Sequence, residues 1–321
     1  MNDLLNENDE RNLGANIGCF NVGLLSYCDD LIILSPYVSQ VNQILNICEE
    51  FANKWKLVFN VKKCNWYIHG NNLISYPNFI LNEGKLIKVD NLIHLGLPIG
   101  NQKHVEEFFC DKYKKVERSF YSLYSLGCKA DGLNYYLISD IYKKFSQSIF
   151  YYGLETNYIR KECIKRINIR QNILIKNTFG MSKYCKTTPL LNAVRIKSIL
   201  QLYEEYKIIF LKQINRNQFT KNIYDHLLNK YSTTLKPSRE SYFHILKEIC
   251  NKYEFNIQNI NIKSSIDIIN SKYQIPNDGL VDSIRYLIGK TGNKNFDNQS
   301  LGLLRLLMMV QPTDNYNNEQ Q

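Results

Sequence analysis

The chain has 321 residues, of which 44% are hydrophobic and 22% charged, which excludes a wholly disordered protein and leaves room for two globular domains. Lys and Arg outnumber Asp and Glu by 40 to 30; this excess favours an anionic partner such as nucleic acid, and an AT-rich coding sequence would produce it equally well. The cysteines are scattered and form no CxxC or Cys–His cluster, which excludes a disulfide scaffold and a zinc module. The sequence shows no signal or transit peptide, and no apolar run reaches the roughly 18 residues that a membrane span needs. We therefore expect a soluble intracellular protein, in the nucleus or the cytoplasm.

Two apolar runs form the first predicted elements. Residues 20–34 predict two strands joined at the letters YCDD, and runs this apolar indicate that helices cover at least one face of the pair. Ser35 and Pro36 predict the start of a helix, with the serine as N-cap and the proline in the first turn. Apolar positions then recur at helical spacing over 38–55, which is typical of an amphipathic helix packed on a sheet.

Short strands are predicted after this helix. Residues 56–70 are rich in β-branched and aromatic side chains and predict one strand or a strand pair. Residues 79–99 predict further short strands, with a turn at Asn82-Glu83-Gly84 and a second break at Leu97-Pro98. Residues 1–100 therefore predict an α+β unit.

Helical patterns dominate after Gly100. They cover residues 103–126, 133–152, 158–178 and 189–213, with shorter ones at 221–230, 238–252 and 279–289. Glycines near the ends of the first three suit left-handed helix caps. We place a first domain at 1–102, a helical domain at 103–215, a helical extension at 216–310 and a frayed polar tail at 311–321.

Asp29 and Asp30 are the main candidate site residues. Two adjacent carboxylates repel each other, so they need water, cations or hydrogen-bond donors. The tip of a simple hairpin gives them solvent, because aspartate is a good turn residue. Alternatively they bind Mg²⁺, which prefers carboxylate oxygens and shares its shell with substrate phosphates; a two-metal site would need a further carboxylate from elsewhere. Both interpretations stay open on these two residues alone.

Several motifs in order carry a family resemblance. Tyr27-Cys28-Asp29-Asp30, a helix and then KLVFNVKKC at 56–64 resemble the reverse transcriptases of non-LTR (LINE-type) retrotransposons, with Lys56 where the family has glycine. HLGLPIG at 94–100 resembles the primer grip, YYGLETN at 151–157 the Tyr-Gly-x-Glu segment of the thumb, and TTPLLNAVRIKSI at 187–199 the helix opening that follows. The resemblance extends from residue 1 to about residue 210.

The resemblance implies a role for each matching hairpin residue. Asp29 matches the metal-ligating aspartate of the family and Asp30 its neighbour, so both are candidate catalytic and metal-binding residues. Tyr27 would lie near the primer terminus and Cys28 near the last nucleotide pair. Lys63 matches a lysine that helps to protonate the departing pyrophosphate, and a solvated strand-end lysine is the alternative.

The same resemblance implies a fold and partners. His94 and Gly96 would belong to the primer grip, whereas a packed β-turn is preferred for Leu95. The fold would be α+β: a partial polymerase palm of antiparallel strands with a packing helix over 1–102, then an all-helical thumb and a helical C-terminal extension. The parent enzyme would use Mg²⁺, or Mn²⁺ in its place, to add deoxynucleoside triphosphates to a DNA primer on an RNA template.

Parts of the family pattern have no match in this sequence. In the family another metal-binding aspartate and the fingers precede the hairpin, so we expect them upstream of Met1 and expect this chain alone to be inactive. No endonuclease domain or C-terminal zinc knuckle is visible. One alternative is a decayed or repurposed product that only binds nucleic acid or a protein partner. A group II intron-type reverse transcriptase is another, and the FNxxKC and Tyr-Gly-x-Glu segments argue against it.

Residues 158–178 predict a candidate nucleic-acid surface. An apolar stripe of Ile159, Cys163, Ile167 and Leu174 leaves the rest of the helix to basic residues that could neutralise phosphates: Arg160, Lys161, Lys165, Arg166, Arg170 and Lys176. A merely solvated basic face is the alternative. Aromatic side chains could stack on bases, although their helical spacing favours core packing: Tyr121, Tyr124, Tyr135, Tyr136, Phe150, Tyr151 and Tyr152.

Overall fold

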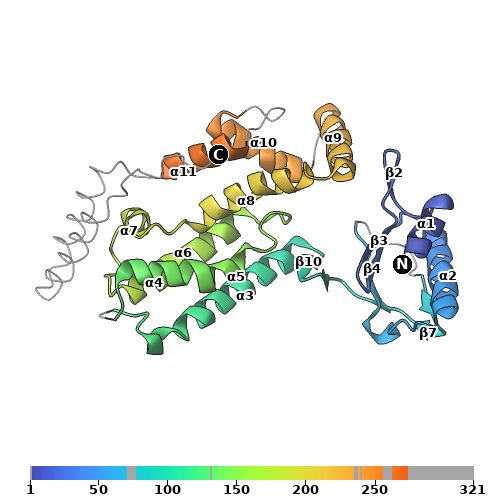
Figure 1. The fold of residues 1–321 in the computed structure, drawn as a ribbon, viewed down its shortest axis with the longest axis horizontal. Coiled ribbons are helices and arrows are strands. Elements are labelled where there is room, and N and C mark those ends of the chain that lie inside the picture. Colours follow the sequence, from blue (N-terminus) through green and yellow to red (C-terminus); the bar gives the residue numbers. More distant parts are fainter. Residues whose placement is uncertain are drawn as a thin grey trace, which may run out of the picture. The chain divides into compact units, whose positions relative to one another are not determined.

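The computed structural model describes residues 2–70, 77–130, 132–234, 238, 241–255 and 262–273. The chain forms two compact units (Figure 1). The first takes its described residues from Met1–Val105 and Gln213–Ser238, and the second from Glu106–Lys212 and Arg239–Gln321. The helix predicted at 279–289 and the tail at 311–321 lie outside the described residues.

The first unit combines short strand pairs with three helices among its described residues. Its elements are α1 (Asn2–Glu10), β1 (Asn16–Ile17), β2 (Phe20–Asn21), β3 (Leu24–Tyr27), β4 (Asp30–Ile33), α2 (Val38–Trp55), the 3₁₀ turn η1 (Val61–Lys63), β5 (Asn65–Trp66), β6 (Ile80–Leu81), β7 (Gly84–Lys85), β8 (Ile87–Lys88), β9 (Leu92–His94), β10 (Leu97–Ile99) and α9 (Gln218–Thr233). The pairs β1–β2, β3–β4, β6–β7 and β9–β10 are antiparallel, whereas β5–β8 is parallel. The α+β class predicted from the sequence is confirmed.

One apolar core holds this unit together. The buried face of α2, which includes Ile44 and Phe51, packs with Leu4 of α1, Leu24 of β3 and Phe79. Leu4 is fully buried, so the acidic N-terminal segment contributes a helix to the core. This helix was not predicted, because its sequence is mostly polar.

The last helix of the unit comes from a distant part of the sequence. α9 contacts β1, and the ring of Phe219 meets Phe20 edge to face at a centroid distance of 5.5 Å. Gly18 lies against the His226 ring so closely that a β-carbon there would clash with it. α9 therefore belongs to the first unit, although the sequence analysis assigned it to the C-terminal extension.

The predicted start of α2 is wrong by two residues. The helix begins at Val38, and the preceding Tyr37 is extended, with φ −123° and no side-chain cap. The Ser35 hydroxyl accepts a hydrogen bond from the Tyr37 amide at 3.1 Å. A local turn of this kind competes with helix formation, so Ser35 holds the chain before the helix instead of capping it.

Two other strand predictions are corrected. Residues 57–64 contain the 3₁₀ turn η1 instead of a strand, and only Asn65–Trp66 pairs with a strand there. The second break falls at Leu95 and Gly96, both with positive φ, while Pro98 lies inside β10 opposite Ile93. In an antiparallel ladder, residue pairs that exchange backbone hydrogen bonds alternate with pairs that do not. The His94–Leu97 pair closes the turn with hydrogen bonds, so the next pair, Ile93–Pro98, needs none, and the missing amide hydrogen of Pro98 costs no ladder hydrogen bond.

Lys56 ends α2 in a conformation that favours glycine. Its φ and ψ are 54° and 39°, and the amide of Leu57 donates to Ala52 at 2.8 Å, closing the last turn. A side chain in this left-handed region is strained. We expect Lys56→Gly to raise the free energy of unfolding by about 1 kcal/mol, measured by urea denaturation. Asn53→Gly, inside the same helix end, should lower it by about 0.5 kcal/mol; a loss in both variants would contradict the assignment.

The second unit is helical throughout its described elements. These are α3 (Gln102–Tyr121, from Glu106 onward), the 3₁₀ turn η2 (Tyr124–Leu126), α4 (Tyr135–Ile141), the π-helical turn η3 (Tyr142–Gln147), α5 (Ser148–Tyr151), α6 (Lys161–Thr178), α7 (Thr187–Ala193), α8 (Ile199–Ile214), α10 (Tyr242–Tyr253) and α11 (Ile262–Tyr273). The predicted helix 189–213 is in fact two helices, because Arg195 takes a left-handed conformation with φ 53° between them. α11 was not predicted.

Aromatic side chains fill the core of this unit. Phe109, Tyr113, Phe120, Tyr142 and Phe150 are fully buried and meet edge to face, as in the Tyr113–Phe150 pair at 5.6 Å. The core-packing interpretation is thus confirmed for Phe150 and not for two other aromatic residues: Tyr121 and Tyr152 are 44% and 50% exposed.

A buried carboxylate joins three helices of the same unit. Glu204 of α8 accepts from Lys252 Nζ at 2.6 Å, from the Tyr253 hydroxyl at 2.6 Å and from the Tyr273 hydroxyl at 2.9 Å. Only 6% of Glu204 is exposed. Burial of a carboxylate is tolerated where donors surround it in this way, so Glu204 fixes α10 and α11 on α8.

Candidate functional site

The predicted hairpin at Asp29 and Asp30 is present. Strands β3 and β4 pair in register from Leu24–Ile33 to Tyr27–Asp30, which leaves Cys28 and Asp29 as a two-residue turn. Cys28 has φ 55°. A tight hairpin needs positive φ at its first central residue, and a side chain there is strained. The turn thus projects two adjacent carboxylates from the end of a strand pair.

Backbone contacts hold the base of the hairpin. The Ala15 amide donates to Leu34 at 2.7 Å, and the Leu34 amide donates to Gly23 at 2.8 Å. Gly14 and Gly23 approach so closely that a β-carbon on either would clash with backbone of the other segment. Glycine is required at this crossing. Because the base is fixed by backbone and by the buried Leu24 side chain, the tip has a defined position in the first unit.

The tip itself is open to solvent. Asp29 and Asp30 are exposed, and Tyr27 beside them is 64% exposed. Among the described residues, no group of three or more His, Cys, Asp or Glu side chains could hold a metal ion. The hairpin itself can present the carboxylate oxygens of two side chains, Asp29 and Asp30, to a cation or a hydrated ligand.

The other residues predicted for this site lie at two turns later in the sequence. Lys63 is exposed at the end of η1, not at a strand end. His94 closes the β9–β10 hairpin opposite Leu97, and Gly96 lies in its turn with φ 73°. Leu95 lies in the same turn with φ 49° and is 37% exposed. Among the described residues, Lys63, His94 and Gly96 make no hydrogen bond or ion pair with Asp29 or Asp30.

The predicted apolar stripe of α6 is confirmed, and most of its basic residues have partners. Ile159, Cys163, Ile167 and Leu174 are buried. The basic residues pair as follows: Arg160 and Arg166 with Glu106 at 3.5 and 3.3 Å, Arg170 with Glu117, Lys161 with Glu248 at 3.2 Å, and Lys176 with the Lys183 carbonyl at 3.0 Å. The acidic side chains of α3 and α10 therefore neutralise much of this helix.

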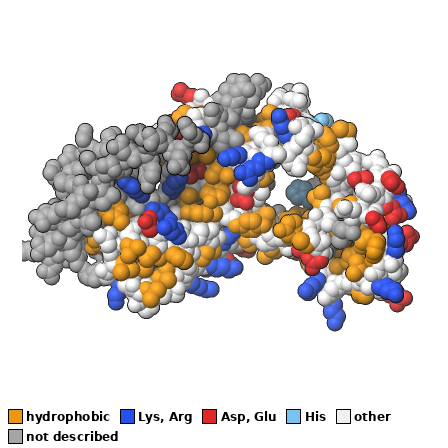
Figure 2. All heavy atoms as spheres, in the orientation of Figure 1, with side chains coloured by type: hydrophobic (Ala, Val, Ile, Leu, Met, Phe, Trp, Pro, Cys, Tyr) orange, Lys and Arg blue, Asp and Glu red, His pale blue; other side chains and the backbone are white. Residues whose placement is uncertain are grey.

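A solvent-facing line remains on α6. Lys161 is only weakly engaged, with 78% of its side chain exposed, and Lys165 one turn later is also exposed. Ile169 and Ile173 continue the line and are 47% and 52% exposed. On the face drawn in Figure 2, basic side chains of the second unit lie among hydrophobic ones and form no continuous basic surface.

The Tyr-Gly-x-Glu segment is held by a buried lysine that sequence reasoning missed. Lys207 of α8 is fully buried, and its Nζ donates to the carbonyls of Glu155 and Asn157 at 3.0 and 2.7 Å. Burial lowers the pKa of Lys207 to about 7. Its place one helical turn from both Tyr203 and Leu211, on the buried side, is the signal that marks it as unusual.

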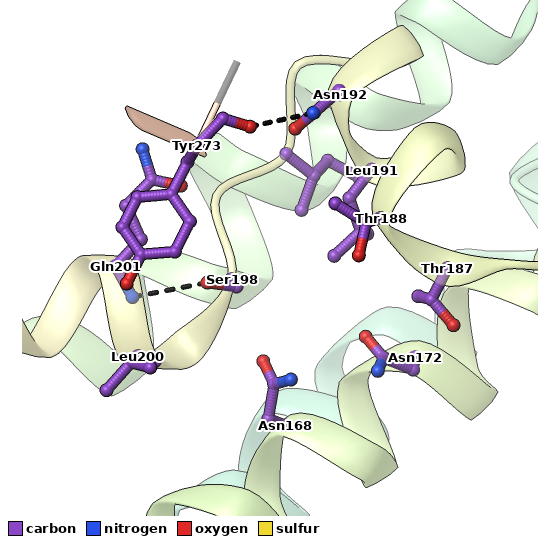
Figure 3. A pocket seen from close by; sticks show the side chains of 11 residues that line it. Asn168, Asn172, Thr187, Thr188, Leu191, Asn192, Ser198, Leu200, Gln201 and Tyr273 are labelled. Carbon is purple, nitrogen blue, oxygen red and sulfur yellow. Dashed lines mark hydrogen bonds between the residues drawn. The ribbon is translucent and has the colours of Figure 1, made fainter. Parts of the chain in front are cut away.

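The segment 187–199 lines a cavity of about 210 Å³ in the second unit. Figure 3 shows Asn168 and Asn172 of α6 at the cavity, with Thr187 and Thr188 of α7 beside them. Asn192 donates to the Tyr273 carbonyl at 2.7 Å in its wall. None of the lining side chains is charged, so the cavity offers neutral hydrogen-bonding groups.

The region that contains the hairpin is similar to a known protein family. Residues 1–108 match the family described as reverse transcriptase (RNA-dependent DNA polymerase). The match covers about a third of the chain and contains the β3–β4 hairpin, α2 and the β9–β10 hairpin. The match thus supports the resemblance of this region to reverse transcriptases. A search of curated proteins gave no match.

Across the described ranges, no helix combines the length and the apolar character needed to cross a membrane.

Proposed function

We propose that residues 1–102 form the C-terminal part of the palm of a LINE-type reverse transcriptase and that the helical residues 103–215 form its thumb. The observation that carries the proposal is the exposed Tyr27-Cys28-Asp29-Asp30 hairpin within a region that matches reverse transcriptases. The later motifs support the LINE-type assignment, since the Tyr-Gly-x-Glu and 187–199 segments follow in the family's order.

The hairpin fits a hard divalent cation in the kind of donors it offers. Asp29 and Asp30 both end in carboxylate oxygens, the ligands that Mg²⁺ and Mn²⁺ prefer, and both are exposed at a fixed tip. A bound pair of such ions supplies activation of a primer hydroxyl and neutralisation of phosphate charge. In this proposal Asp29 and Asp30 hold part of that site, Lys63 donates a proton to departing pyrophosphate, and Tyr27, Cys28, His94 and Gly96 position the primer.

The proposed partner of the thumb is the duplex of RNA template and DNA primer. Support comes from the exposed cations of α6, Lys161 and Lys165, which lie one turn apart and can contact successive phosphates. Arg160, Arg166 and Arg170 share their charge with Glu106 and Glu117. These three arginines therefore fix α6 against α3 and add little net positive charge to the proposed surface.

Binding to an RNA–DNA hybrid tests this proposal. We expect the full chain to bind the hybrid in fluorescence anisotropy, more weakly as salt rises. Lys161→Glu with Lys165→Glu should weaken binding about 100-fold and lower the slope of log affinity against log salt by about two. The matched control, Lys247→Glu with Lys263→Glu, makes the same change of net charge on α10 and α11. Equal losses in both doubles, or no loss in the first, would contradict the assignment.

The same samples give a second readout. With Mg²⁺ and deoxynucleoside triphosphates, we expect the chain alone to add no nucleotide to the primer, because one hairpin supplies only part of the ligands that two ions need. Primer extension that disappears in Asp29→Asn would overturn the expected inactivity and would strengthen the site assignment. Hybrid binding without extension would agree with both parts of the proposal.

A further inference from the structure

Two thiols face each other across the interface of α3 and α6. Cys110 Sγ and Cys163 Sγ lie 3.8 Å apart, although the residues are far apart in the sequence. Cys163 is fully buried and Cys110 is half-buried. A disulfide has its sulfur atoms about 2 Å apart, so a small movement of the two side chains would bring them to bonding distance.

Other contacts hold these two helices in place around the thiols. Arg166 bonds to Glu106 at 3.3 Å, Arg170 pairs with Glu117, and Arg170 Nη1 donates to the Cys110 carbonyl at 3.4 Å. The Sγ–Sγ approach is therefore a property of a packed interface and not of two mobile loops. Oxidation would join side chains that the fold already presents to each other.

We propose that Cys110 and Cys163 are an oxidation site, at which a hydroperoxide such as hydrogen peroxide converts the two thiols into a disulfide that links α3 to α6. This inference goes beyond the proposed function and does not depend on it. Oxidation would covalently fix the helix pair that carries the Glu106 and Glu117 ion pairs.

The two thiols differ in the roles they can take. Burial raises the pKa of the Cys163 thiol to about 12, so Cys163 stays protonated at neutral pH, and the more accessible Cys110 reacts first. The Cys110 thiolate attacks the peroxide: an S–O bond forms, the O–O bond breaks, and the departing hydroxide takes up a proton as water. Cys163 then attacks the Cys110 sulfur, the S–S bond forms, and the sulfenic oxygen leaves with the Cys163 proton as a second water. The Arg166 guanidinium, which favours the ionised form of Cys163, can stabilise the negative charge that develops on this sulfur.

Disulfide mapping of the full chain tests the site. After treatment with hydrogen peroxide, alkylation of remaining thiols and proteolysis, mass spectrometry should show the peptides of Cys110 and Cys163 joined, as the most abundant cysteine pair. The melting temperature should rise on oxidation and return on addition of dithiothreitol. In urea the same treatment should give mixed pairs, because the fold no longer selects the partner.

Two variants separate the specific bond from general oxidation. Cys110→Ala should abolish both the joined peptides and the shift in melting temperature, whereas Cys128→Ala, at another buried cysteine of the same unit, should keep both. The exposed Cys19 reports that oxidant was sufficient. The proposal fails if peroxide fully oxidises Cys19 in the native chain while Cys110 and Cys163 stay as free thiols, which alkylation after denaturation would detect. It also fails if Cys110 or Cys163 forms its disulfide mainly with another cysteine.

Discussion

Replacement of Lys207 by alanine is expected to lower the free energy of unfolding by about 3 kcal/mol. The change leaves a cavity beside Tyr203, whose ring centroid lies 4.9 Å from Lys207 Nζ. It also removes the donor for the carbonyls of Glu155 and Asn157, which receive its hydrogen bonds at 3.0 and 2.7 Å. Urea denaturation followed by circular dichroism measures the loss. A loss below about 1 kcal/mol would show that these carbonyls find water or another donor.

Lys207→Met separates the charge from the packing. The pKa of Lys207 is lowered to about 7 in the folded chain, so between that value and the ordinary one the unfolded state binds a proton that the folded state has lost. Stability of the native sequence should therefore rise with pH above 7, by about 1 kcal/mol per pH unit up to pH 9, relative to Lys207→Met. Measurement of the difference between the two chains cancels every other titrating group. Parallel pH profiles would contradict the burial of a neutral lysine.

Replacement of Glu204 by alanine is expected to lower the free energy of unfolding by about 3 kcal/mol. Lys252 and the hydroxyls of Tyr253 and Tyr273 all donate to this one carboxylate. Its removal takes away the carboxylate that an ammonium group and two phenols share, and leaves Lys252 with only the Tyr273 hydroxyl as an acceptor in this cluster, so α10 and α11 lose their common attachment to α8. Thermal and urea denaturation measure the loss.

Two further variants serve as controls for Glu204. Glu204→Gln keeps one oxygen acceptor and removes the charge, so about half of the loss should remain. Lys212→Ala, at an exposed position on the same helix, should change stability by less than about 0.5 kcal/mol. If Glu204→Ala is no worse than Lys212→Ala, the three donors must be satisfied elsewhere.

Local patterns predicted the hairpin and the helix that follows it. The paired apolar runs around Asp29 and Asp30 and the helical spacing over 38–55 both depend on neighbours in the sequence, and both elements are present. The break expected at Leu97-Pro98 was misplaced, because a proline at an edge position without a ladder hydrogen bond does not end a strand. The 3₁₀ turn before Cys64 was mistaken for part of a strand, because the residues that lead into it, Leu57, Val58 and Phe59, are β-branched, aromatic or apolar.

Contacts between distant residues could not be predicted. The basic character of α6 was apparent from its sequence, whereas the partners of Arg166 and Arg170 lie on α3, more than fifty residues earlier. Helical spacing places Lys207 on the buried side of α8, whereas the carbonyls that accept its hydrogen bonds, in the 155–157 segment, are brought to it only by the fold. Helical periodicity says which face of a helix is buried, and tertiary packing decides which charged groups meet there.

The attachment of α9 to the first unit has a consequence for synthesis on the ribosome. Domains usually fold as they emerge, starting from the N-terminus, yet this unit draws on residues on both sides of Glu106–Lys212. Phe20 must wait for Phe219, its partner at 5.5 Å, until the intervening helices have been translated. A nascent chain that stalls before Gln218 would carry the finished hairpin on a domain that still lacks one of its helices.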